Sequence, residues 1–131
     1  MVDILILEDD GLTRAILRTV LGTVGYTLVE TDNGEDGLNM VLAHQPRVVM
    51  ADLHLPGMDG LTFAQRMRLL PFIVVPHLIF MSASPPAHMI DVGQRAMLNK
   101  PFDMELLLAQ IDELVPAPFT MPALRELSRG A

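Results

Sequence analysis

The chain has 131 residues, a formal net charge of −7 and no cysteine. This length favours a single domain whose core is large enough to fold without cross-links, and the missing thiols exclude disulfides and thiolate metal sites. The acidic balance, with a pI of about 4.8, argues against direct binding to nucleic-acid phosphates.

No segment is expected to enter a membrane, although the mean hydropathy is high, at +0.37. The most apolar stretch, residues 69–81, is interrupted by Pro71 and Pro76 and is shorter than the roughly 20 residues that a membrane-spanning helix needs. The chain reaches an acid at Asp3 and lacks the basic region of a signal peptide. We therefore expect a cytoplasmic protein.

Strand and helix patterns alternate along the chain. The apolar run 4–7 predicts a strand buried on both faces, and apolar residues spaced by four predict a helix over 12–24. Further on we expect strands at 27–31, 47–52, 77–81 and 96–99, helices at 35–43, 61–70 and 103–115, and one or two helical turns at 87–92. Such alternation predicts an α/β fold with a doubly wound parallel sheet.

Polar residues stand where four of the expected strands end. They are Glu8, Asp9 and Asp10 after the first strand, Asp52 at the end of the third, Ser82 after the fourth and Lys100 after the fifth. Sites in open parallel sheets form at this edge. Clustered carboxylates favour Mg²⁺ or a similar hard cation. A metal, a lysine and a hydroxyl together suit phosphoryl transfer, in which a carboxylate can act as the nucleophile.

Four segments resemble the receiver domain of two-component response regulators, the CheY-like superfamily. They are "LILEDD" (5–10), "VVMADLHLPGMDG" (48–60), "IFMSA" (79–83) and "NKPF" (99–102). The resemblance covers residues 2 to about 115. It implies a (βα)5 flavodoxin-like fold with strand order 2-1-3-4-5, in which residues 1–115 form the receiver domain and 116–131 a C-terminal tail or linker.

The resemblance assigns roles in a metal and phosphoacceptor site. Asp52 matches the phosphoacceptor aspartate, and Asp9 matches the direct ligand of Mg²⁺, which Asp52 also binds. Glu8 matches the first acid of the pair and would act on the metal indirectly. His54 stands where the family lends a backbone carbonyl to the metal. Asp10 lies one position beyond the pair and is expected to cap the following helix.

Three further residues match positions that contact the phosphoryl group. Ser82 matches the switch hydroxyl, with an ordinary turn serine as the alternative. Lys100, the only lysine of the chain, matches the lysine that contacts the phosphate. Pro101 follows it at a bond that is cis in the family.

Two departures from the family pattern fall on its signalling face. Only 17 residues separate Ser82 from Lys100, and Pro85 and Pro86 interrupt this segment, which predicts a shortened or irregular fourth helix. Met97 stands where the family often has an aromatic residue that moves with the switch hydroxyl. The phosphorylation site matches the family, so phosphoryl chemistry is expected more firmly than the usual output mechanism.

The function implied is that of a phosphoacceptor in a phosphorelay. A histidine kinase or phosphotransfer protein would phosphorylate Asp52, and the changed conformation would regulate a downstream protein or output domain, with a phosphorylation-dependent homodimer left open. Such a domain is not an enzyme, apart from slow self-dephosphorylation. The alternative is a receiver-like docking module that acts without phosphorylation. A phosphatase of the haloacid-dehalogenase type is disfavoured, because His54 replaces the second acid it needs.

Overall fold

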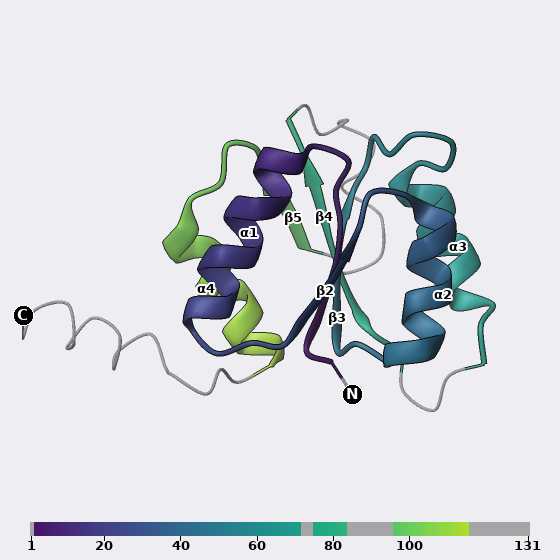
Figure 1. Cartoon of the computed structure of the whole chain (residues 1–131), viewed down its shortest axis with the longest axis horizontal. Helices are drawn as coiled ribbons and strands as arrows, with labels where there is room; N and C mark the ends of the chain where they lie inside the picture. The colour runs from purple at the N-terminus through teal and green to yellow at the C-terminus, as the bar shows by residue number, and fades with distance from the viewer. Residues whose placement is uncertain (1, 72–74, 84–95, 116–131) are drawn as a thin grey trace, which may run out of the picture.

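Five parallel strands and four helices make up the part of the chain that the computed structural model describes, residues 2–71, 75–83 and 96–115 (Figure 1). In chain order they are β1 (Ile4–Leu7), α1 (Gly11–Thr23), β2 (Leu28–Thr31), α2 (Gly34–His44), β3 (Val48–Asp52), α3 (Gly60–Arg68), β4 (His77–Ser82), β5 (Ala96–Asn99) and α4 (Met104–Leu114). The sheet order is β2-β1-β3-β4-β5. This confirms the predicted doubly wound fold and its strand order.

Helices cover both faces of the sheet. Figure 1 shows α1 and α4 on one side and α2 and α3 on the other. Successive residues of a strand point to opposite faces, so Ile4 and Ile6 join the core beneath α1 and α4, whereas Leu5 and Leu7 join the core beneath α2 and α3. The continuous apolar run of β1 follows from this double burial.

Each helix begins at a side chain that accepts a hydrogen bond from the backbone three residues on. These N-caps are Asp10, Asn33, Asp59 and Asp103. Such a cap satisfies one of the N–H groups that the first helical turn leaves without a partner. The cap predicted at Asp10 is confirmed.

The strands expected at 4–7 and 96–99 agree with the observed ones, and the other expected elements of the described ranges end within two residues of the observed bounds. One of these differences concerns the site: β4 includes Ser82, whereas the expected strand ended at residue 81. The helical turns expected at 87–92, and with them the shortened helix predicted between Ser82 and Lys100, lie outside the described residues. The tail 116–131 lies outside them too. In the described ranges, no helix is both long enough and apolar enough to cross a membrane.

Candidate functional site

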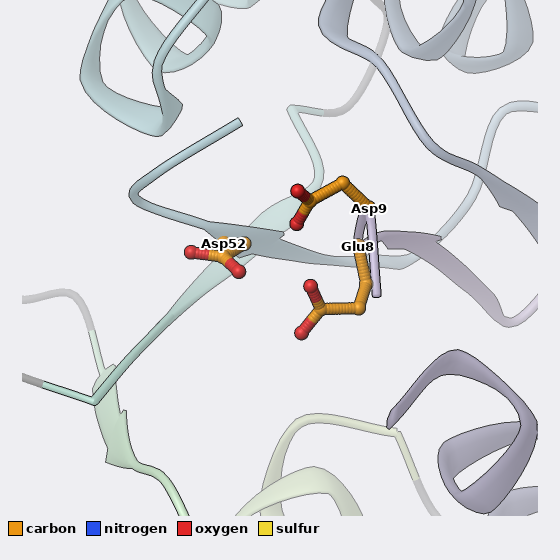
Figure 2. Close-up of side chains that lie close together, drawn as sticks. All are labelled: Glu8, Asp9 and Asp52. Carbon is orange, nitrogen blue, oxygen red and sulfur yellow. The ribbon is translucent and has the colours of Figure 1, made fainter. Parts of the chain in front are cut away.

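The sheet topology brings the predicted acidic residues together at the carboxyl ends of the strands. β1 and β3 are neighbours, with Leu7 opposite Ala51, so Glu8 and Asp52 both lie one residue beyond that pair. Figure 2 shows the carboxylates of Glu8, Asp9 and Asp52 extending into one space. One carboxylate oxygen from each of the three lies within 4.8 Å of the others.

The Lys100 ammonium joins two of these carboxylates. It donates to Glu8 Oε1 and, at 2.7 Å, to Asp52 Oδ2. Its backbone N–H donates to the carbonyl of Ser82 at 2.9 Å, which fixes the start of the side chain beside the end of β4. The Lys100–Pro101 bond is cis, as predicted.

The loop after β3 encloses the Asp52 carboxylate. The backbone N–H of His54 donates to Asp52 Oδ1 at 2.8 Å, and Asp52 is only 5% exposed. Gly60 closes the loop by donating to the Leu53 carbonyl at 3.0 Å. A Cβ atom at position 60 would lie 2.7 Å from the Asp52 carbonyl oxygen. Only glycine therefore permits this close approach behind the carboxylate.

Glu8 and Asp9 follow one another but differ in burial. Glu8 is completely buried, and the N–H of Asp10 donates to its Oε2 at 3.2 Å. Asp9 is exposed to solvent. The pair thus presents one accessible ligand and one enclosed carboxylate beside Asp52.

Asp10 has a different role from its two neighbours. Its carboxylate accepts a hydrogen bond from the N–H of Thr13 at 2.9 Å and caps α1. Bonds from Thr13 lower the pKa of Asp10. Asp10 thus caps the helix, as predicted, and stands apart from the pair formed by Glu8 and Asp9.

Burial and the shared ammonium set the charge states of the site. Burial raises the pKa of Glu8 to about 7, although the bond from Lys100 lowers it, and the adjacent Asp52 adds to the rise. Burial would also raise the pKa of Asp52, but the bonds from Lys100 and from the His54 N–H outweigh it and hold that pKa below its usual value. Burial would lower the pKa of Lys100, but the bonds to Asp52 and Glu8 outweigh this effect and raise that pKa above its usual value. At neutral pH, Asp52 is therefore ionised and Lys100 protonated.

Two predicted switch residues are placed less completely. Ser82 is fully buried at the end of β4 and shares the edge of the sheet with the acidic group. Met97 pairs with Phe80 across β4 and β5, whereas its side chain lies outside what the structure describes. The predicted roles of the Ser82 hydroxyl, the Met97 side chain and the His54 carbonyl stay predictions.

The donor set fits a hard divalent cation. Three carboxylates supply only oxygen ligands, and one of them, Asp9, is exposed to solvent. Mg²⁺ is commonly bound through one or two carboxylates and retains several waters. The residues present therefore suit Mg²⁺ better than a metal that prefers nitrogen or sulfur ligands.

Comparison with known proteins decides the family. The model of the response regulator receiver domain matches residues 4–112. The chain belongs to this family. Receiver domains act in two-component signalling, and the fold and the acidic group described above are consistent with a phosphoacceptor role.

Individual relatives have similar receiver domains in different contexts. Over 117 residues, 86% of this chain, the receiver domain is 29% identical to sporulation initiation phosphotransferase F of Bacillus subtilis (strain 168), of which the match covers 93%. It is 32% identical to response regulator MprA of Mycobacterium ulcerans (strain Agy99) over 87% of this chain. The match spans about half the length of that relative, 50%.

A solved structure shows the same fold. It is the receiver domain of a sensor histidine kinase from Pseudomonas aeruginosa PAO1, with a TM-score of 0.78 and 19% identity over 86% of this chain and 96% of that one. That structure has a magnesium ion coordinated in its active site cleft. Receiver domains of this fold therefore occur both in response regulators and in histidine kinases.

Two contributors to the site were missed by sequence reasoning. Arg14 of α1 donates to the backbone carbonyl of Glu8 at 2.8 Å, and Gly60 packs against the carbonyl of Asp52. Gly60 lies within the quoted segment 48–60, so its motif held a signal. An arginine on an amphipathic helix has none, because most such residues lie on a solvated face.

Proposed function

We propose that Asp52 is the phosphoacceptor of this receiver domain and that its donor is the phosphohistidine of a histidine kinase or phosphotransfer protein. The observation that carries the proposal is the enclosed Asp52 carboxylate, which Lys100 and the His54 N–H hold at 2.7 and 2.8 Å. A carboxylate held at a fixed position meets the main requirement of phosphoryl transfer, in which positioning and neutralisation of charge dominate.

The transfer step exchanges one bond of phosphorus for another. An oxygen of Asp52 forms a bond to phosphorus while the bond from phosphorus to the donor's imidazole nitrogen breaks, so that an acyl phosphate forms and the imidazole leaves with its electron pair. Lys100 then moves from Asp52 Oδ2 to a phosphoryl oxygen. The Ser82 hydroxyl binds another phosphoryl oxygen.

Mg²⁺ is the cofactor that we assign to the site. Asp9 and Asp52 would bind it directly, the His54 backbone carbonyl would be a third protein ligand, and Glu8 would act through solvent or by orienting its neighbours. When bound, the ion neutralises charge on the phosphoryl oxygens during transfer. The magnesium ion in the related Pseudomonas aeruginosa receiver domain supports this assignment.

The conformational change would spread from the site through β4, which ends at Ser82, and β5, which ends just before Lys100. Binding of both side chains to the phosphoryl group would draw the ends of β4 and β5 toward Asp52, with Met97 adjusting on β5, and would shift a two-state equilibrium. A downstream protein or output domain would read this change. We place the receiver domain in residues 1–115, regard 116–131 as a tail or linker, and assign the protein to the cytoplasm.

Phosphorylation can be tested without knowing the cognate kinase. The protein is incubated with acetyl phosphate and Mg²⁺, and its intact mass is compared with that of Asp52→Ala and of a sample treated with a chelator. We expect the mass of one phosphoryl group on the wild type alone, followed by slow loss through hydrolysis. An unchanged wild-type mass would favour the docking module that acts without phosphorylation.

The same samples also test assembly. Size-exclusion chromatography before and after phosphorylation distinguishes a phosphorylation-dependent homodimer from a monomer. A shift to larger size that requires both acetyl phosphate and Asp52 would support the homodimer. Identical elution of all samples would contradict it and leave the phosphoacceptor assignment unaffected.

A further inference from the structure

Arg14 connects helix α1 to the backbone between the two acidic residues of the site. Its Nη1 donates to the Glu8 carbonyl oxygen at 2.8 Å, and its Nε donates to Glu30 Oε1 at 3.3 Å. The Arg14 and Glu30 side chains are 25% and 26% exposed, so both are largely shielded from water. One guanidinium thus bridges α1, β2 and the end of β1.

The two backbone groups of Glu8 bond to different parts of the molecule. The Glu8 N–H still donates to the Thr31 carbonyl of β2 at 3.1 Å. On the other side of the residue, the carbonyl accepts from a side chain, Arg14. This carbonyl belongs to the peptide unit between Glu8 and Asp9, so its orientation helps to set the direction in which Asp9 leaves the strand.

Glu30 holds the guanidinium in place. It lies on β2 opposite Ile6 of β1, on the strand next to the one that ends in the acidic pair. Its Oε1 accepts from Arg14 and also from Arg18 Nη1 at 2.6 Å. A planar guanidinium can contact two acceptors at a fixed angle, whereas the lysine ammonium is a point charge on a flexible stem.

From this geometry we propose that Arg14 is a positioning residue for the metal site, acting on Asp9 through the Glu8 carbonyl. The inference rests on the proposed function, in which Asp9 binds Mg²⁺. Groups that orient metal ligands usually change metal affinity by about 10- to 100-fold when they are removed. We expect a loss of about tenfold for Arg14→Ala, because Arg14 acts through the backbone and one residue away from the ligand.

The sign of the effect separates positioning from simple charge. Removing a positive charge near a cation site should strengthen cation binding, since it removes repulsion. Loss of positioning should weaken binding. Weaker Mg²⁺ binding by Arg14→Ala therefore identifies a positioning role that electrostatics alone would not produce.

Arg18 supplies a matched control on the same helix. Its Nη1 donates to the same Glu30 oxygen, yet its side chain is 53% exposed. Arg18→Ala removes the same charge and one bond to Glu30 without removing the bond to Glu8. Arg14→Lys keeps the charge but cannot reproduce the guanidinium fork.

The experiment measures Mg²⁺ affinity by isothermal titration calorimetry, without phosphorylation, on the wild type and these three variants. Urea denaturation of each variant verifies that it is folded. We expect weaker binding for Arg14→Ala, an intermediate affinity for Arg14→Lys and no loss of affinity for Arg18→Ala. The backbone amide signal of Asp9 in NMR spectra should shift in both Arg14 variants.

The outcomes distinguish failure of this inference from failure of the proposed function. Wild-type affinity in Arg14→Ala, or an equal loss in Arg18→Ala, overturns the positioning role while Mg²⁺ binding stands. If Asp52→Ala also leaves Mg²⁺ binding unchanged, the ion binds elsewhere, and both the metal assignment and the inference are wrong. Should Arg14→Ala not fold, Arg14→Lys alone decides between a loss of affinity and none.

Discussion

The two ends of the strands use polar groups in different ways. At the amino ends, partners match one to one: Asp3 and Thr27 exchange two hydrogen bonds of 2.9 Å, and the Tyr26 hydroxyl donates to the Val115 carbonyl at 2.8 Å. At the carboxyl ends, one ammonium, that of Lys100, serves two enclosed carboxylates. The first arrangement stabilises the fold, whereas the second leaves negative charge for a ligand to neutralise.

Asp9→Ala should have the largest effect on function. It removes the accessible ligand of the proposed Mg²⁺ site, so we expect Mg²⁺-dependent phosphorylation by acetyl phosphate to be abolished. Stability should change little, because the side chain is exposed. Intact mass gives the first quantity and urea denaturation the second. Normal phosphorylation of Asp9→Ala would show that the carboxyl-end site does not need this ligand.

Lys100→Met should damage both function and stability. Loss of the ammonium should slow phosphorylation on the order of 10²-fold, as removal of one preorganised charged group usually does. The two carboxylates keep their burial without their partner, so the pKa values of Glu8 and Asp52 should rise. Stability of the variant relative to the wild type should then fall as pH increases, because the folded state resists ionisation more than the unfolded state.

Urea denaturation of Lys100→Met and the wild type at pH 5 and pH 8 measures this dependence. The difference in the free energy of unfolding should be larger at pH 8. An equal difference at both values would mean that Lys100 does not compensate the buried carboxylates.

Tyr26→Phe should affect stability and leave Mg²⁺ binding unchanged. The variant loses the bond to the Val115 carbonyl, which should cost about 1 kcal/mol. Burial raises the pKa of Tyr26 to about 12, above the value near 10 of an exposed tyrosine. The contribution of the Tyr26 hydroxyl to the free energy of unfolding is therefore complete below pH 10 and is lost as pH rises toward 12.

Tyr26 is the only tyrosine, and the chain has no tryptophan, so the ultraviolet absorbance of tyrosinate reports on this residue alone. A titration followed together with circular dichroism should show ionisation well above pH 10 while the fold persists. Ionisation near pH 10 in the folded protein would contradict the buried hydrogen bond.

Asp10→Ala should have only a small effect, confined to stability, and tests where the site ends. The variant loses the N-cap of α1, so we expect a melting temperature that is a few degrees lower. Mg²⁺ affinity should equal that of the wild type, because Asp10 faces Thr13 and the helix. A loss as large as that of Asp9→Ala would extend the metal site to the third acid.

Sequence patterns predicted the strand and helix order and the gathering of acidic side chains at one edge of the sheet. Both follow from where each buried strand begins and ends. Two-sided burial makes β1 a continuous apolar run, and parallel pairing then carries Glu8 and Asp52 to one edge without further information. The Arg14 bridge could not be predicted in this way. It depends on the rotation of α1 over the sheet and on Glu30 of β2, 16 residues away, which no local spacing reveals.

Lys100 also has a mechanical consequence. β5 is one of the two edge strands of the described sheet and pairs only with β4, yet the residue that follows it, Lys100, bonds to the carboxylates at the ends of β1 and β3. The outer strand is thus tethered to the middle of the sheet across β4. If the Lys100 ammonium changes its partner, the force on β5 can change without breaking the backbone hydrogen bonds between β5 and β4.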